Sequence, residues 1–388
     1  MASAVGAAAP VTILVGIDGF RWDYLDRGVT PTLSRLAAEG VRARQMRPGF
    51  PSSTYPNFYT LVTGKRPDHN GVVANIMEDP DLPGRVFSMA NRAEVMDGVW
   101  WQEAEPIWVT ARRQGRASAS IFWPGSESRI RGVRPDYWLP FEQSVSSAAR
   151  VNLLLSWLGL PGAERPDFAA LYFDIVDSNG HSGGPQSDLL SQALVEVDAA
   201  MGRLMDGLTA RGLTANVIVV SDHGMTAISA DRVLFLDDIV DVSAIQAMVA
   251  GAYAVITPKG PNAAAAEAAL LQARPHLQCW RKADIPARLD YGRNPRVGPI
   301  LCLADLGWQV AMRADFNPAY ATGGAHGYDP GEPDMAGVFI ANGPAFAKGM
   351  TLEQIDNVDV YPLLAALLGV TPQPNQGSLA ATAAGLRR

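Results

Sequence analysis

Five apolar segments rich in β-branched residues are spread along the chain, and helical patterns separate them. These segments are VTILVGID (11–18), ASASIFW (117–123), FAALYFDIV (168–176), NVIVVSD (216–222) and GVFIAN (337–342). Most of them are apolar throughout instead of alternating, as expected for strands that are covered on both faces. Alternation of strands and helices predicts a mostly parallel sheet with right-handed crossovers, sandwiched by helices. The fold class that the chain favours is therefore α/β.

Three segments with helical spacing lie between or after these strands. The segment 30–40 has Thr30 as a candidate N-cap, a proline in its first turn and a glycine at its end. The segments 187–212 and 358–369 have apolar residues at helical spacing. We expect these helices to cover the faces of the sheet.

The pattern changes between about 230 and 320, where the predicted elements are shorter and include an alanine-rich helix at 262–273. This region is typical of a small α+β insertion between two parts of a larger sheet. We therefore expect a catalytic core formed by 11–230 and 321–375, and a smaller insertion or capping domain at 231–320.

Composition and charge exclude several classes of partner. The net charge of −7 leaves no basic excess to neutralise phosphates, which argues against nucleic acid as a stable partner. No apolar stretch reaches the ~18 residues that a membrane span needs, so we expect a soluble chain. The oligomeric state is not predicted.

The first residues and the cysteines leave the compartment open. The start, MASAVGAAAP, lacks a basic leader and fits either a frayed arm or the remnant of a processed export signal. Cys279 and Cys302 are the only cysteines. Two cysteines are more often unpaired and buried than bridged, although a disulfide fits an exported protein.

Acidic and imidazole side chains follow three of the predicted strands. Asp18 ends the first strand, Asp177 and His181 follow the third, and Asp222 and His223 end the fourth. Each aspartate taken alone fits a turn residue or a helix N-cap. Because ligands in such folds bind outside the carboxyl ends of the strands, we expect these side chains to lie together.

His326 extends this set from the glycine-flanked loop GGAHGYD. Three aspartates and three histidines in one place would repel one another or be poorly solvated without a cation. Mixed carboxylate and imidazole ligands suit zinc, so the pattern predicts two divalent metal ions. Asp174, three residues before Asp177, fits a hydrogen-bonded core carboxylate instead.

A run of hydroxyl residues supplies candidate nucleophiles. Prolines exclude a helix interior at the start of PGFPSSTYPNFYTLVTG (48–64), and helical spacing then continues to Gly64. Ser52, Ser53 and Thr54 are thus expected at a helix N-terminus, where Ser and Thr are also ordinary caps. A hydroxyl at this place can be ionised by a metal and the helix dipole together and attack phosphorus. The pattern alone does not choose among the three.

Several motifs, in this order, resemble the nucleotide pyrophosphatase/phosphodiesterase family of the alkaline phosphatase superfamily. They are GIDGFRWDYL, PSSTYPNFYTLVTGKRPDHNGVVAN, DSNGHSGGP, SDHGM and GAHGYD, and the similarity spans roughly residues 11 to 370. The resemblance implies an alkaline-phosphatase-like fold and a hydrolase of the phosphodiesterase I and nucleotide pyrophosphatase type. Such an enzyme uses two zinc ions and a covalent threonine nucleotidyl intermediate to cleave nucleotide diesters and nucleoside triphosphates to nucleoside 5′-monophosphates.

The resemblance also implies roles for the candidate residues. Thr54 matches the nucleophile, whose oxygen also binds one of the zinc ions. The remaining ligands of that zinc match Asp18, Asp222 and His223, and the ligands of the second zinc match Asp177, His181 and His326.

Three further residues match positions that contact the substrate. Asn75 matches an amide that supports a non-bridging phosphate oxygen, and Tyr55 and Tyr172 match aromatic residues near the nucleotide base. Tyr55 stands where phenylalanine is common, and Asn70 where many members have histidine. Base preference therefore stays open.

Two other functions are alternatives to this one. A related enzyme with the same metals can act on phosphomonoesters, phosphonates or lipid headgroup diesters, but monoesterases need extra positive charge, and no further acidic cluster supplies it. A non-catalytic binding protein is disfavoured because none of the seven metal and nucleophile positions is lost. Relatives are generally exported, so the resemblance implies a periplasmic or secreted protein.

Overall fold

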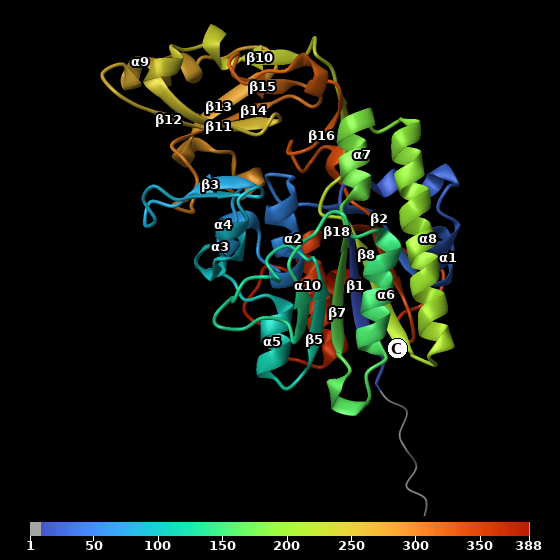
Figure 1. Ribbon diagram of the computed structural model, residues 1–388. Helices are drawn as coiled ribbons and strands as arrows, with labels where there is room; N and C mark the ends of the chain where they lie inside the picture. The colour runs from blue at the N-terminus through green and yellow to red at the C-terminus, as the bar shows by residue number, and fades with distance from the viewer. Residues whose placement is uncertain (1–8, 388) are drawn as a thin grey trace, which may run out of the picture.

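The computed structural model describes residues 9–387, and its centre is an eight-stranded sheet (Figure 1). The strand order across it is β18-β2-β17-β8-β1-β7-β5-β6. In chain order the strands are β1 (Val11–Ile17), β2 (Val41–Arg47), β5 (Ser118–Ile121), β6 (Tyr137–Leu139), β7 (Phe168–Phe173), β8 (Ala215–Val220), β17 (Phe339–Asn342) and β18 (Met350–Asp356). Neighbouring strands are parallel except around β17, which runs antiparallel to both β8 and β2. The predicted α/β fold with a mostly parallel sheet is confirmed.

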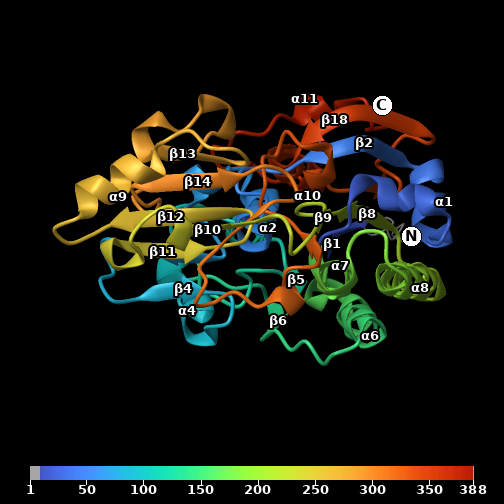
Figure 2. The same cartoon turned by 90° about the horizontal axis from the view of Figure 1, so that it is seen from above.

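Helices cover both faces of this sheet (Figures 1 and 2). On one face α8 (Asp188–Ala210) contacts α1 (Pro31–Glu39) and α6 (Ser147–Leu158). On the other face α10 (Val360–Leu368) contacts α2 (Thr54–Thr63) and α5 (Ile107–Arg113). The other helices are α3 (Pro67–Asn70), α4 (Arg92–Met96), α7 (Ile175–Gly183), α9 (Ala263–Leu270) and α11 (Leu379–Ala383).

The three helices predicted from spacing correspond to α1, α8 and α10, with ends within two residues of the expected ones. Thr30 precedes α1 as expected, but its side chain makes no capping hydrogen bond. None of the helices within residues 9–387 combines the length and the apolar character that crossing a bilayer requires.

A second, four-stranded antiparallel sheet lies within the region 231–320. Its order is β11-β12-β14-β13, with β11 (Ile245–Val249), β12 (Tyr253–Pro258), β13 (Leu277–Arg281) and β14 (Ile300–Ala304). The short strand pairs are β3 (Ile76–Glu78) with β4 (Val86–Ser88), β9 (Thr226–Ile228) with β16 (Gly323–Ala325), and β10 (Val233–Phe235) with β15 (Gln309–Ala311). Figure 1 shows the second sheet as a separate layer beside the end of the large sheet where α2 and α7 lie. The division into a core and an insertion domain stays a prediction.

Two contacts give the second sheet its fixed form and place. Cys279 on β13 faces Cys302 on β14, and a disulfide joins them. Asp68 on α3 is buried, and its carboxylate accepts hydrogen bonds from the backbone N–H groups of residues 292–294 at 2.9 to 3.0 Å. The connection between β13 and β14 of the second sheet is thereby fixed to α3. Residues 1–8 lie outside the described residues. The two interpretations of the first ten residues, a frayed arm and the remnant of an export signal, therefore stay predictions.

Candidate active site

Three adjacent strands bring distant polar residues to one edge of the large sheet. β1 lies between β8 and β7, and all three run parallel. Asp18 follows β1, and Asp222 and His223 follow β8. One ligand atom from each of these three buried residues lies within 4.8 Å of the others. The convergence expected at the strand ends is therefore present for this group.

A second group comes from α7 and the loop after β16. The predicted strand 168–176 ends at Phe173 instead, and residues 175–183 form a helix. In this helix the four-residue spacing corresponds to about one turn, so Asp177 and His181 lie on the same face. His326 completes the group, and one ligand atom from each of the three lies within 4.8 Å of the others.

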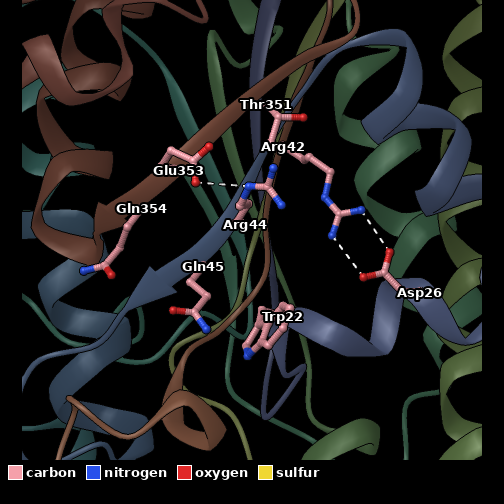
Figure 3. Close-up of a pocket in the computed structure, with 8 residues that line it drawn as sticks. All are labelled: Trp22, Asp26, Arg42, Arg44, Gln45, Thr351, Glu353 and Gln354. Atoms are coloured by element: carbon pink, nitrogen blue, oxygen red, sulfur yellow. Dashed lines mark hydrogen bonds and ion pairs between the residues drawn. The ribbon is translucent and has the colours of Figure 1, made fainter.

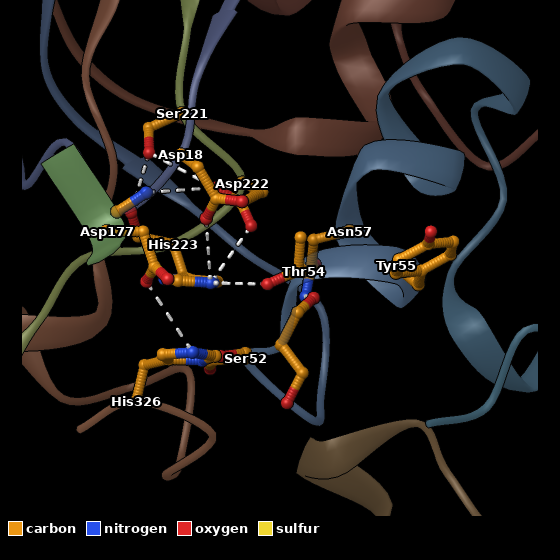
Figure 4. A network of polar contacts seen from close by, with 12 residues as sticks. Asp18, Ser52, Thr54, Tyr55, Asn57, Asp177, Ser221, Asp222, His223 and His326 are labelled. Atoms are coloured by element: carbon orange, nitrogen blue, oxygen red, sulfur yellow. Dashed lines mark hydrogen bonds and ion pairs between the residues drawn. The ribbon is translucent and has the colours of Figure 1, made fainter. Parts of the chain in front are cut away.

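The two groups form one cluster, and Figure 4 shows its members Asp18, Asp177, Asp222, His223 and His326 next to the start of α2. The imidazole rings of His223 and His326 stack, with centroids 3.6 Å apart and an angle of 12° between their planes. Nε2 of His326 lies 3.7 Å from Oδ1 of Asp177. All six aspartates and histidines predicted to bind metal are thus brought together, while their role as ligands stays a prediction.

The backbone fixes the tautomer of all three histidines. Nδ1 of each lies 2.8 Å from a carbonyl oxygen, namely that of Gly324 for His181, of Gly224 for His223 and of Ser52 for His326. A carbonyl oxygen can only accept, so each Nδ1 carries the proton and donates it. Each Nε2 is therefore left with a lone pair, which is the arrangement that metal-binding histidines need.

The lone pairs of the cluster face one another without a donor between them. Nε2 of His223 lies 2.9 Å from Oδ2 of Asp222 and 3.4 Å from Oδ1 of Asp18. Within residues 9–387, Oδ1 of Asp18, Oδ1 of Asp177 and Oδ2 of Asp222 are buried and receive no hydrogen bond. Buried acceptors without partners are costly, and only a proton or a cation can satisfy them together.

The crowding of buried carboxylates also shifts the pKa values of the aspartates. Burial, and then the charges of Asp222 and Asp177, raise the pKa of Asp18 well above its usual value. Burial also raises the pKa of Asp177, against the opposing charges of His181 and His223.

The pKa values of two of the histidines shift in opposite directions. Burial, and then the charges of His223 and His181, lower the pKa of His326 well below its usual value. Burial lowers the pKa of His223 too, but the charge and hydrogen bond of Asp222, the charge of Asp177 and the bond to the Gly224 backbone together outweigh it, and the net direction is upward. A cluster of carboxylates and imidazoles fits divalent zinc.

Of the three candidate hydroxyls, that of Thr54 faces the cluster. Thr54 is the first residue of α2, and its Oγ1 lies 3.4 Å from Nε2 of His223. The Ser52 hydroxyl points away and donates to the carbonyl of Tyr328 at 2.9 Å, and the Ser53 side chain makes no capping hydrogen bond at the start of α2. The direction in which the chain enters α2 therefore turns Thr54 Oγ1 toward the cluster, and its role as the nucleophile stays a prediction.

Asn75 lies beside the start of α2. Its Oδ1 accepts the backbone N–H of Tyr55 at 2.9 Å, which fixes the amide and leaves its Nδ2 group free to donate. The Tyr55 ring packs against Phe87 and Trp101, with centroids 5.6 and 5.9 Å away.

Tyr172 serves the cluster in a way that the sequence did not suggest. Its ring lines the cleft described below, but its hydroxyl donates to Oδ2 of Asp18 at 2.6 Å. A contact between its ring and a nucleotide base stays a prediction.

A cleft of about 210 Å³ adjoins the cluster. The residues that line it are Asp18, Thr54, Tyr55, Met89, Arg92, Phe122, Pro124, Glu127, Phe141, Gln143, Tyr172, Asp174, Asp177 and Ser178. Sequence reasoning missed Arg92, Glu127 and Phe141. Glu127 lies just after β5, so the rule of strand ends, applied to the segment 117–123, would have pointed to it.

A larger hollow of about 550 Å³ lies elsewhere, on β2 and β18 (Figure 3). Its charged residues already pair with one another, Arg42 with Asp26 at 3.0 Å and Arg44 with Glu353 at 3.1 Å. None of its lining residues belongs to the cluster, so the smaller cleft is the candidate site.

Comparisons with known proteins show the family of the chain. The family model described as type I phosphodiesterase / nucleotide pyrophosphatase matches residues 12–329. Ectonucleotide pyrophosphatase/phosphodiesterase family member 5 from Homo sapiens is 37% identical over 368 residues, which cover 94% of this chain and 76% of that protein. The Xenopus laevis bis(5′-adenosyl)-triphosphatase enpp4 is 38% identical over 379 residues, which cover 97% and 81%.

Solved structures of a relative match the whole fold. Murine ectonucleotide pyrophosphatase / phosphodiesterase 5 has a TM-score of 0.92 at 37% identity, covering 97% of this chain and 100% of that one. An inactive variant of it, with alanine in place of a threonine and in complex with AMP, has a TM-score of 0.92 at 36% identity, covering 98% and 100%. The expected alkaline-phosphatase-like α/β fold is thereby confirmed.

Proposed function

Because the chain belongs to the type I phosphodiesterase / nucleotide pyrophosphatase family and is a hydrolase of that type, we propose that it cleaves nucleotide diesters and nucleoside triphosphates to nucleoside 5′-monophosphates. The observation that carries this proposal is the position of the Thr54 hydroxyl, 3.4 Å from His223 in a cluster of unsatisfied acceptors. A small nucleotide is therefore the partner that we assign to the cleft.

Two zinc ions are the cofactors that we assign to the cluster. Asp18, Asp222 and His223, with Thr54, would hold one ion, and Asp177, His181 and His326 would hold the other. The ions, when bound, would supply the positive charge that makes a hydroxyl nucleophilic and offsets the charge on phosphate oxygens.

The protein groups perform the reaction in two displacements. Thr54 Oγ1 gives its proton to solvent and attacks phosphorus while the bond from phosphorus to the leaving oxygen breaks, which forms a threonine nucleotidyl intermediate. Water then loses a proton and attacks phosphorus, and the bond from phosphorus to Oγ1 breaks; Oγ1 takes up a proton, which restores the hydroxyl and releases the nucleoside monophosphate. The position of Thr54 at the N-terminus of α2 favours negative charge on its oxygen. Two in-line displacements retain the configuration at phosphorus.

The walls of the cleft suit a nucleoside. Tyr55 and Phe141 line it with aromatic rings, and Arg92, Glu127 and Gln143 line it with polar groups. Small-molecule sites commonly combine aromatic faces with a few polar groups in this way. The solved relative in complex with AMP supports a nucleotide as the ligand.

We expect diesters to be hydrolysed far faster than monoesters. A monoester dianion has one more negative charge, and within residues 9–387 the cleft contributes a single arginine, which is paired with Glu127. The kcat/KM for a p-nitrophenyl nucleotide diester should exceed that for p-nitrophenyl phosphate at least about a hundredfold, or about 3 kcal/mol. Dominant turnover of the monoester would overturn the assignment.

Replacement of Asn75 by alanine is expected to lower kcat for the diester about a hundredfold. The amide is fixed by the backbone of Tyr55, and loss of such a preorganised donor typically costs about 3 kcal/mol of transition-state stabilisation. Asn70→Ala is a suitable comparison for fold effects, because the Asn70 amide is also bonded to the backbone, donating to the carbonyl of Lys65 and accepting the N–H of Val72, both at 2.9 Å. Equal losses of kcat in the two variants would remove Asn75 from the reaction.

We also propose that the protein works outside the cytoplasm, in the periplasm or as a secreted enzyme. The disulfide between Cys279 and Cys302 suits an oxidising compartment, and the matched relatives are named as ectonucleotide enzymes.

A further inference from the structure

The hydroxyl of Tyr172 is buried directly beneath the cluster. Tyr172 is 7% exposed and Asp18 is 2% exposed, and the distance from the hydroxyl to Oδ2 of Asp18 is 2.6 Å. This bond occupies one oxygen of the carboxylate, whereas Oδ1 receives no hydrogen bond within residues 9–387. One oxygen of Asp18 is therefore bonded to the Tyr172 hydroxyl, and the other is available to a ligand.

The register of the sheet explains why this tyrosine reaches this aspartate. Tyr172 on β7 lies opposite Gly16 on β1, and Asp18 follows Gly16 by two residues, so all three lie on one face. A Cβ on Gly16 would lie 2.5 Å from Cε1 of Phe58, so the glycine makes room for that ring. Phe58 packs edge-on against the Tyr172 ring at 5.1 Å and holds it along the sheet.

Arg150 fixes the backbone of the same tyrosine. Its Nη1 donates to the carbonyl of Tyr172 at 2.9 Å and lies 2.7 Å from Oδ1 of Asp174. The Arg150 side chain is 3% exposed, so these contacts are shielded from solvent. The ring, the hydroxyl and the main chain of Tyr172 are all held, which leaves the hydroxyl little freedom to leave Asp18.

We propose that Tyr172 is a positioning residue that orients Asp18 toward the metal held with Asp222 and His223. The proposal rests on the proposed function, because it requires that the cluster binds zinc. A single strong hydrogen bond to Oδ2 prevents rotation of the carboxylate and keeps Oδ1 aimed at the cluster. Hydrogen-bond partners that orient a ligand in this way typically change metal affinity by about 10- to 100-fold.

The test is the replacement of Tyr172 by phenylalanine, which removes the hydroxyl and keeps the ring. Zinc alone is the probe, and its affinity is measured by competition with a chromophoric chelator. We expect the Kd of one of the two zinc ions to rise at least about tenfold and that of the other to stay within about twofold. At saturating zinc, kcat for a nucleotide diester should fall while KM changes less than about threefold, because the ring still lines the cleft.

Tyr361→Phe is the matched control. Tyr361 on α10 is also fully buried, and its hydroxyl accepts from the backbone of Gln373 at 2.9 Å, away from the cluster. This variant should lose a buried hydroxyl, with a similar decrease in Tm, and bind both zinc ions as tightly as the unaltered protein.

The outcomes separate this proposal from the one that it rests on. If the unaltered protein binds zinc and Tyr172→Phe binds both ions equally well, the positioning role is wrong and the proposed function stands. If both tyrosine variants lose affinity equally, the effect is one of fold stability, and the positioning role is again wrong. If the unaltered protein binds no zinc, the metal assignment fails first.

Discussion

Replacement of Thr54 by alanine is expected to abolish nearly all diester hydrolysis, with kcat lower by at least about a thousandfold. The Thr54 hydroxyl is the one among the three candidates that lies against His223, at 3.4 Å, and no neighbouring hydroxyl can take its place without a change in the entry to α2. The six aspartates and histidines of the cluster are untouched, so zinc should still bind. The measurement is the turnover of a p-nitrophenyl nucleotide diester together with the zinc content of the purified variant.

Ser53→Ala supplies the matched control for Thr54→Ala. Ser53 precedes α2 and its side chain makes no capping hydrogen bond, so its loss should change kcat less than about threefold. Near-normal turnover by Thr54→Ala would move the nucleophile to Ser52 or Ser53. A zinc-free Thr54→Ala protein would instead show that the threonine is needed mainly as a ligand.

Removal of all metal by exhaustive chelation should also lower activity at least about a thousandfold, and added zinc should restore it. Without a cation, nothing within residues 9–387 satisfies the facing acceptors of Asp18, Asp177 and Asp222, and nothing makes the Thr54 hydroxyl nucleophilic. Turnover is measured before chelation, after it, and after titration with zinc.

The same titration has a readout that does not depend on turnover. A ligand that binds only the folded state stabilises it, by about 2.7 kcal/mol when its free concentration is 100 times its Kd. The Tm should therefore rise with zinc concentration, because the ion relieves the repulsion among buried carboxylates. Full activity and an unchanged Tm in metal-free protein would refute the site.

The strands that are buried on both faces could be read from the sequence, and the half-exposed ones could not. β1, β7 and β8 are continuous apolar runs, whereas β2 (VRARQMR) places arginines on its outer face near the edge of the sheet. A strand of that kind looks like a charged loop segment when its neighbours are unknown. The antiparallel direction of β17 has no local signal either, because a strand as short as FIAN does not indicate the direction of its neighbours.

The chemistry of the cluster was easier to predict than the shape of the cleft. Asp18, Asp222 and His223 stand immediately after predicted strands, so the rule of strand ends places them together. Phe141 follows β6, a three-residue strand with no recognisable pattern, and Arg92 comes from the short α4. Such residues reach the cleft through tertiary packing, which no local pattern encodes. The bond from Tyr172 to Asp18, two residues that are 154 positions apart, likewise depends on the register between β1 and β7.

The dependence of all three histidines on carbonyl oxygens decides which changes the site can tolerate. No side-chain substitution can delete those three acceptors, so the imidazoles keep their tautomers however the surrounding side chains vary. What must be preserved is the path of the main chain. A Cβ on Gly224 would lie 2.1 Å from the carbonyl oxygen of Asp334, and one on Gly324 would lie 2.6 Å from that of Gly180. An engineer who wishes to change the substrate of this scaffold can therefore vary the cleft residues other than Asp18, Thr54, Tyr172 and Asp177, provided that these two glycines are left unaltered.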